Sequence, residues 1–268
     1  MPTATANGID LNYVASGAGE HTVVFAHGLL YDLHMFEPQR QALSEHYRVI
    51  AYDHRGQGES APASSGYDLD TLTEDAVDLI RGTHSEPCHF VGLSMGGFVG
   101  LRLAARYPEL VRSLTLLSTS ASAESWLKRA RYRVMQAIFA LFGPRPIMGP
   151  LLPVMFGPSF RTDPARRAEL ERWVHHVQSL PRRVVGPVGG VIGRASVVPE
   201  LKYIRCPTLV LVGDEDQTTP PEEAELLVRE ISGARLVRLS NCGHNSSIEA
   251  PDAVTSAIRQ FLAEVDAA

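Results

Sequence analysis

The sequence predicts an α/β fold in which a mostly parallel, eight-stranded sheet is flanked by helices. Short apolar runs alternate with amphipathic stretches along most of the chain, and strands that alternate with helices are typical of a parallel sheet covered on both faces. The 268 residues suffice for one core of this size. One long interval breaks the alternation and predicts an insertion.

Apolar runs that are too short for helices mark the strands. The run Val23-Val24-Phe25-Ala26 is bounded by Gly28, which is typical of a strand buried on both faces. Asn7-Gly8 supplies two residues that tolerate positive φ, so it predicts a tight hairpin between the first two strands. The predicted strands are Thr3–Ala6, Ile9–Ala15, His21–Ala26, Tyr47–Tyr52, Cys88–Leu93, Val111–Leu117, Thr208–Val212 and Arg235–Leu239.

Apolar residues at helical spacing predict helices between these strands. In Leu72–Ile80, for example, the apolar residues share one face. In an open parallel sheet the ligand site lies beyond the carboxyl ends of the strands, where the helices begin. The predicted helices are Met35–Glu45, Leu72–Ile80, Gly96–Arg106, Pro221–Glu230 and Pro251–Val265.

The interval from Ser120 to Pro199 departs from this rhythm. It holds two Pro/Gly-rich patches, Gly143–Pro150 and Gly186–Gly193, beside the helical stretches Trp126–Leu141 and Pro164–Leu180. A structureless loop of this length would be improbable. We therefore expect a core domain of residues 1–119 and 200–268, with residues 120–199 inserted as a helical cap, or lid, over the carboxyl ends of the strands.

Composition excludes several classes of protein. The chain is 44% hydrophobic and 21% charged, as in ordinary globular proteins. No stretch approaches the roughly 20 apolar residues of a membrane span, and Met1–Asn12 does not resemble a signal peptide. With a pI near 6.1 and no basic patch interleaved with aromatic residues, we expect no nucleic-acid partner. The expectation is a cytoplasmic protein with no membrane partner.

The cysteines predict neither disulfides nor a metal site. Cys88, Cys206 and Cys242 are few, odd in number and unpatterned. They form no Cys-x-x-Cys pair and no Cys/His cluster with the spacing of metal ligands. We expect three reduced thiols and no bound metal.

Charge is distributed unevenly along the chain. Between Ala121 and Pro199 there are 12 Lys and Arg against 4 Asp and Glu, a local net charge of +8, while the whole chain carries −5. Such a basic segment draws anionic substrates in some proteins. A solvated helix face that pairs with acids of the body explains the same pattern.

The strongest motif is Gly92-Leu93-Ser94-Met95-Gly96-Gly97, which follows a predicted strand and opens a predicted helix. A serine at such a corner adopts a strained backbone that leaves its hydroxyl free, and the crowding around it requires glycine at the flanking positions. The helix N-terminus aims free N–H groups and the positive end of its dipole at the same point. The motif predicts that Ser94 is a nucleophile.

Several pieces of the chain together resemble the α/β-hydrolase family, over roughly residues 22–117 and 207–262. Within it, the early half is similar to the branch of enol-lactonases, small carboxylesterases and haloperoxidase-like perhydrolases. The serine nucleophile argues against the dehalogenase and epoxide hydrolase branches, which use aspartate. The matching pieces are His27-Gly28-Leu29, Asp53–Ser60, Gly92–Gly97, Gly213–Asp216 and Gly243-His244.

The resemblance implies a Ser-His-Asp triad in the chain order nucleophile, acid, histidine. His244 is the one of ten histidines that lies in a loop directly after the last strand, so it is the expected base. The loop after Thr208–Val212 offers Asp214, Glu215 and Asp216. We expect Asp216 to orient the base, because the third position past the strand-ending glycine is where this loop turns toward the histidine in the family; Asp214 is the competitor.

Attack on a carbonyl also needs donors for the oxyanion. The backbone N–H of Met95, directly after the nucleophile, is one expected donor. The backbone N–H of Leu29, in the loop after an early strand, is the second. His27 fits a structural role below that loop.

The resemblance implies acyl transfer without a metal or organic cofactor. We expect hydrolysis of small to medium carboxylic esters by way of an acyl-enzyme. The alternatives are an enol-lactonase that takes an anionic lactone, a perhydrolase, and a catalytically quiet receptor that binds a small molecule. The expected partner is thus a small ester or lactone. Apolar residues that would line its pocket, each explained equally well as core, are Leu30, Trp126, Phe139, Phe142, Met148, Met155 and Phe156.

Overall fold

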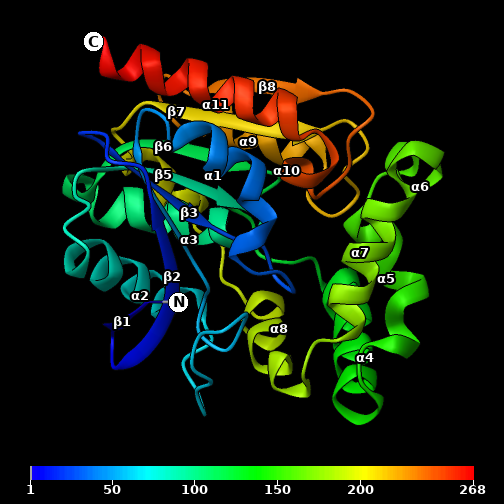
Figure 1. The fold of residues 1–268 in the computed structure, drawn as a ribbon. Helices are drawn as coiled ribbons and strands as arrows, with labels where there is room; N and C mark the ends of the chain where they lie inside the picture. Colours follow the sequence, from blue (N-terminus) through cyan, green and yellow to red (C-terminus); the bar gives the residue numbers. More distant parts are fainter. Residues whose placement is uncertain (1) are drawn as a thin grey trace.

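A single twisted sheet of eight strands forms the centre of the molecule (Figure 1). The computed structural model describes residues 2–268, so the first residue of the expected core range lies outside it. The strand order is β1-β2-β4-β3-β5-β6-β7-β8. Strands β1 and β2 run antiparallel to their neighbours, and every other neighbouring pair is parallel. This confirms the predicted mostly parallel, eight-stranded sheet.

The strands form where the apolar runs predicted them, within one residue at each end. All residues of β3, β5 and β7 are buried, because helices cover both faces of the sheet. Asn7 and Gly8 take φ of 47° and 73° in the hairpin between the first two strands. The strands are β1 Thr3–Ala6, β2 Ile9–Ser16, β3 Thr22–Ala26, β4 Arg48–Tyr52, β5 Cys88–Leu93, β6 Val111–Leu117, β7 Thr208–Gly213 and β8 Arg235–Leu239.

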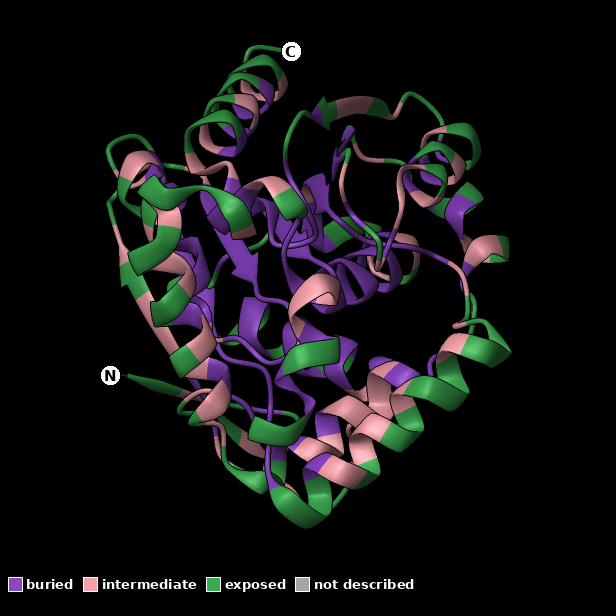
Figure 2. Cartoon of the chain, turned by 90° about the vertical axis from the view of Figure 1, so that its right-hand side faces the viewer, coloured by how far each residue is buried: buried purple, intermediate pink, exposed green. Residues whose placement is uncertain are grey.

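Helices cover the two faces of the sheet in separate layers. Helices α2 (Leu69–Gly82), α3 (Met95–Arg106) and α9 (Pro221–Glu230) pack on one face, and α1 (Glu37–Leu43) and α11 (Pro251–Asp266) on the other. Figure 2 shows the buried residues gathered in the centre of the molecule, between these layers. The short helix α10 comprises Ser246–Glu249.

Five further helices lie between β6 and β7 in the chain and stand beside the carboxyl ends of the strands (Figure 1). The Pro/Gly-rich patches do not stay irregular. Helix α8 occupies most of the second patch, because apolar residues between its glycines pack against the neighbouring helix α4. These helices are α4 Trp126–Phe142, α5 Met148–Met155, α6 Pro158–Thr162, α7 Arg167–Gln178 and α8 Val185–Ile192.

Six 3₁₀ helices complete the regular structure of the described residues. The predicted helix Met35–Glu45 is divided into such a turn and α1, and the predicted helix Pro164–Leu180 begins with another. No helix within residues 2–268 is both long and apolar enough to cross a membrane. The 3₁₀ helices are Leu33–Phe36, Pro108–Leu110, Arg145–Ile147, Pro164–Arg166, Arg182–Val184 and Val198–Tyr203.

Candidate active site

Ser94 lies at the sharp corner between β5 and α3. Its backbone has φ 51° and ψ −108°, a conformation that residues other than glycine rarely adopt. A Cβ atom on Gly92 would stand 2.3 Å from the carbonyl oxygen of Gly96, and one on Gly96 would stand 2.0 Å from that of Ala26. The two flanking glycines are therefore required by close contacts between backbone segments.

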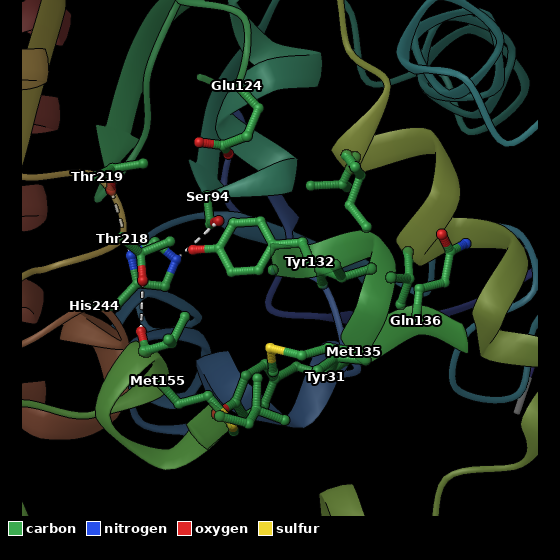
Figure 3. Close-up of a pocket in the computed structure, with 18 of the residues that line it drawn as sticks. Tyr31, Ser94, Glu124, Tyr132, Met135, Gln136, Met155, Thr218, Thr219 and His244 are labelled. Atoms are coloured by element: carbon green, nitrogen blue, oxygen red, sulfur yellow. Dashed lines mark hydrogen bonds between the residues drawn. The ribbon is translucent and has the colours of Figure 1, made fainter. Parts of the chain in front are cut away.

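The side chain of Ser94 meets an imidazole from the other end of the chain. The Oγ atom of Ser94 lies 2.9 Å from Nε2 of His244 (Figure 3). Nδ1 of His244 lies 2.9 Å from Oδ2 of Asp216 and 3.1 Å from its Oδ1. All three residues are buried, with at most 9% of their surface exposed. The structure thus brings the three predicted side chains into one hydrogen-bonded row.

The three carboxylates that follow β7 have three different partners. Asp214 is exposed and accepts a hydrogen bond of 2.7 Å from Nε of Arg238. Glu215 accepts hydrogen bonds from the backbone N–H and the hydroxyl of Ser159, in the cap. Of the three, Asp216 alone reaches the imidazole of His244. Within this loop, Asp214 therefore forms a surface ion pair, Glu215 contacts the inserted helices, and Asp216 contacts the histidine.

Hydrogen bonds keep the Asp216 carboxylate ionised. Burial acts to raise the pKa of Asp216, but the His244 imidazole, the hydrogen bond to it and the donors of Thr219 outweigh burial and lower that pKa. The N–H groups of Thr218 and Thr219 donate to Oδ1 over 2.8 and 3.0 Å, and the Thr219 hydroxyl donates to Oδ2 over 2.9 Å. An ionised, fixed carboxylate places the proton of the imidazole on Nδ1 and leaves Nε2 facing Ser94 as the acceptor.

Two backbone N–H groups lie beside the serine without a protein acceptor among residues 2–268. They belong to Leu29, in the loop after β3, and to Met95, the first residue of α3. The N–H of Leu30 is not free, since it donates to Oε1 of Gln57 over 2.9 Å. The position of Leu29 and Met95 is that expected of donors to an oxyanion.

His27 holds the loop that contains Leu29. The N–H of His54 donates to Nε2 of His27 over 3.0 Å, so the ring proton sits on Nδ1, which donates to the carbonyl of Gly28 over 2.7 Å. Burial lowers the pKa of His27, which keeps the ring neutral. Its role in the structure is to connect this loop to the turn after β4.

A largely apolar pocket opens above Ser94 and His244 (Figure 3). It contains about 940 Å³ of empty space, a volume that includes the solvent at its mouth. One wall comes from the loops of the sheet and the other from α4, α5 and α8. The main residues of the cap wall are Tyr132, Met135, Gln136, Phe139, Ile147, Leu151, Met155, Val188, Val191 and Ile192.

Of the seven residues predicted for the pocket, Leu30, Phe139 and Met155 line it. The structure does not bring the other four to it. Trp126 and Phe142 are at the two ends of α4 and are exposed. Met148 and Phe156, at the two ends of α5, are buried in the core cluster that the cap shares with the sheet domain, outside the pocket lining.

One basic residue, Arg194, is among those that line this pocket within the described chain. Its guanidinium is paired with the Glu124 carboxylate at 3.0 Å and also donates to the carbonyls of Ser122 and Val191. It lies over the ring of Phe98, 4.4 Å from the centroid. The positive charge of the cap is thus largely outside the pocket, and the one arginine inside it is neutralised.

Glu249 connects the histidine loop to the cap. Its buried carboxylate accepts backbone hydrogen bonds from the two neighbours of His244, Gly243 at 2.8 Å and Asn245 at 3.0 Å. It accepts a third, of 3.0 Å, from Gly157 between α5 and α6. Burial raises the pKa of Glu249 to about 6 even though these donors act to lower it.

Sequence reasoning missed several of these residues. Thr219 and Glu249 have local signals, since Thr219 lies in the loop of Asp216 and Glu249 ends the short helix that follows His244. Gln57 lies in the matching turn Asp53–Ser60, but its contact with Leu30, 27 positions away, has no local signal, and neither has the contact of Arg194 with Glu124, 70 positions away. No group of His, Cys, Asp and Glu side chains within residues 2–268 is arranged to hold a metal ion.

Known proteins resemble this chain over nearly its whole length. Residues 21–251 match the model of the α/β hydrolase fold. The 3-oxoadipate enol-lactonase 2 of Acinetobacter baylyi is 28% identical over 97% of this chain and 96% of its own. Among solved structures, the enol-lactonase of Burkholderia xenovorans has a TM-score of 0.87 at 31% identity and covers 98% of this chain and 100% of its own. A thermophilic esterase of Thermogutta terrifontis reaches 0.90 at 30% identity, with 98% of each chain covered. The family model spans well over half of the sequence, and the sheet, the Ser94 corner and the inserted helices agree with it, so this chain belongs to the α/β-hydrolase fold family.

Proposed function

We propose that the protein is a serine hydrolase that cleaves small to medium carboxylic esters. The observation that carries the proposal is the buried row of Ser94, His244 and Asp216 at the floor of an apolar pocket. Residues 1–119 and 200–268 act as the catalytic core, and residues 120–199 as a cap that forms the acyl pocket. The esterase and the enol-lactonases that this chain resembles support the same class of reaction.

Acylation begins when Oγ of Ser94 attacks the ester carbonyl. Nε2 of His244, 2.9 Å away, accepts the proton of the hydroxyl, and Asp216 stabilises the imidazolium. The N–H groups of Leu29 and Met95 bind the oxyanion, an interaction that contributes roughly 3 kcal/mol per donor to transition-state stability. The imidazolium then gives its proton to the departing alcohol, and the acyl group stays on Ser94.

Deacylation repeats these steps with water as the nucleophile. His244 removes a proton from water, which attacks the acyl carbonyl, and the same two N–H groups hold the second oxyanion. Collapse of the intermediate returns the proton to Oγ of Ser94 and releases the carboxylic acid. The serine and the imidazole thus end in their starting state.

The pocket favours a neutral ester over an anionic lactone. Its lining is mostly apolar, and Arg194 is already paired with Glu124. A clamp for a substrate carboxylate would require an unpaired, fork-shaped donor set at this place. An apolar acyl chain would instead contact side chains such as Phe139, Leu151 and Met155.

A series of p-nitrophenyl esters from acetate to laurate tests this function. We expect kcat/KM to rise with chain length until the pocket is full, by up to about fourfold per buried methylene, and to fall beyond it. Hydrolysis of a carboxylate-bearing enol-lactone, measured in parallel, is expected to be slower. Faster turnover of the lactone than of every neutral ester would contradict the preference for neutral esters.

The carboxylate of Glu249 is expected to position His244 and to set the acid limit of activity. Its pKa of about 6 means that it is ionised at pH 8 and mostly protonated at pH 5, where it accepts fewer hydrogen bonds from Gly243 and Asn245. In Glu249→Gln the amide N–H₂ group faces a backbone donor at every pH. We expect kcat/KM at pH 8 to fall by about 10²-fold, as misplacement of a catalytic group by roughly 1 Å does.

The pH profile separates this role from a purely structural one. For the wild type, the slope of log kcat/KM against pH should steepen below pH 6, since Glu249 takes up a proton there. In Glu249→Gln this steepening should be lost, because the amide does not titrate. The matched control is Asp252→Asn, which alters an exposed acid three residues away. It should change neither kcat/KM at pH 8 nor the slope of the pH profile. An unchanged slope in Glu249→Gln would show that Glu249 does not act on the base.

A further inference from the structure

The outer face of helix α4 is an exposed apolar stripe. Within residues 2–268, five of the six large hydrophobic side chains that are exposed belong to this helix, and they are 61–76% exposed. At about 3.6 residues per turn, positions spaced by three and four residues fall on one side of a helix. The residues of this stripe are Leu127, Ala130, Val134, Ala137 and Leu141, with Trp126 and Phe142 at its ends.

The same helix turns its other side to the pocket. Tyr132 and Met135 point into the cavity (Figure 3), and Gln136 also lines it. Packing of the protein's own core therefore explains the inner side and leaves the outer stripe unexplained.

Arginines border the stripe on both sides. By the helical repeat, Arg131 lies along one edge, and Arg129 and Arg133 lie along the other. Their guanidinium groups donate to uncharged acceptors, namely the carbonyl of Glu124, the hydroxyl of Tyr132 and the side-chain oxygen of Gln136. The helix itself holds no Asp or Glu. The surface thus combines apolar side chains with uncompensated positive charge.

A second copy of this chain is a poor match for this surface. Two α4 helices placed face to face would bring like charges together, which is unfavourable. The rest of the chain is acidic, but among the described residues it exposes one large apolar side chain, Tyr203, so it offers no apolar patch to cover the stripe. A partner must be apolar and anionic at once.

We propose that the outer face of α4 binds the surface of an anionic lipid bilayer, with the helix axis in the plane of the surface. The apolar stripe would enter the boundary between headgroups and acyl chains, while the bordering arginines reach the headgroup phosphates. The charge distribution orients the molecule: residues 121–199 carry +8 and the remainder −13, so the cap faces the surface and the body points away.

A helix that lies on a bilayer surface differs from one that spans the membrane. The expectation of no membrane partner rested on the absence of a long apolar segment, and a surface-bound helix needs none. The inference is also independent of the proposed reaction, because it concerns the face of α4 opposite the pocket. Its test therefore measures binding alone.

Co-sedimentation with lipid vesicles tests the proposal. We expect the wild type to bind vesicles of equal parts phosphatidylcholine and phosphatidylglycerol at least about tenfold more tightly than vesicles of phosphatidylcholine alone. Raising the salt to about 0.5 M should abolish most of this preference. Arg131→Gln/Arg133→Gln should weaken binding by about fivefold per arginine, and Leu127→Gln/Val134→Gln/Leu141→Gln by about tenfold or more.

The matched control changes Tyr203, the large apolar side chain that is exposed outside α4 among the described residues, together with the nearby Lys202 and Arg205. Lys202→Gln/Tyr203→Gln/Arg205→Gln removes two charges and one apolar side chain from the body and should bind anionic vesicles as the wild type does. Because the three apolar positions on α4 are exposed, their variant should keep the wild-type circular dichroism spectrum. Equal binding to both vesicle types, or no loss in the α4 variants, would overturn the proposal. So would a dimer, seen by light scattering, that only the α4 variants disrupt.

Discussion

Ser94→Ala is expected to lower kcat/KM for p-nitrophenyl esters by roughly 10⁵- to 10⁶-fold while the fold stays intact. The substitution removes Oγ, the atom that forms the acyl bond in the proposed reaction, and leaves the proposed oxyanion donors of Leu29 and Met95 in place. A small residual rate above that of water is therefore expected. Alanine keeps the Cβ atom, so the strained corner at φ 51° meets no new contact.

Ser118→Ala is the matched control for this variant. Ser118 is also buried, also has positive φ, at 46°, and also lies at the carboxyl end of a central strand, β6. Its hydroxyl faces Ser246 over 3.5 Å and not the imidazole. Turnover should change little in Ser118→Ala, and melting temperatures of both variants should stay close to that of the wild type. Retained ester turnover in Ser94→Ala would remove Ser94 as the nucleophile.

Labelling provides a second measurement that does not depend on substrate choice. A fluorophosphonate probe forms a covalent bond only with a serine that a base activates. We expect one adduct per wild-type chain, on the peptide that contains Ser94, and none in Ser94→Ala. An adduct on another serine would assign the nucleophile elsewhere.

The sheet and the residues at the carboxyl ends of its strands could be predicted because their signals are local. The run of apolar residues in β3 and the glycines around Ser94 each express a constraint that acts within a few residues: burial on both faces, and close contact between backbone segments. The position of His244 follows from its place directly after β8. Such features tolerate few alternative residues, so the sequence displays them.

The inserted helices could be predicted only in outline, because their signals are not local. Val185–Ile192 contains three glycines and a proline, yet it is helical, since its contacts with α4 outweigh weak intrinsic propensity. The same limit explains the pocket. Trp126 and Phe139 are both aromatic residues of α4, and only the packing of the cap decides that one is exposed and the other lines the cavity.

Asp216→Asn is expected to lower kcat/KM by about 10³- to 10⁴-fold. The amide oxygen can keep the hydrogen bonds from Thr218 and Thr219, so the loop should hold its shape. The amide N–H₂ group would then face Nδ1 of His244 and donate to it. The ring proton moves to Nε2, the atom that faces Ser94, and the imidazole can no longer accept the proton of the serine hydroxyl.

Asp214→Asn, the same substitution two residues earlier, isolates this effect. It weakens only the exposed ion pair with Arg238, and exposed ion pairs contribute little to stability, so kcat/KM should remain close to the wild-type value. The two variants lose the same charge from the same loop, and they differ in whether the carboxylate touches the imidazole. The values of kcat/KM for both variants at pH 8 decide which carboxylate orients His244. A larger loss in Asp214→Asn would assign this role to Asp214. A larger loss in Asp216→Asn, the expected result, assigns it to the one carboxylate that reaches the imidazole.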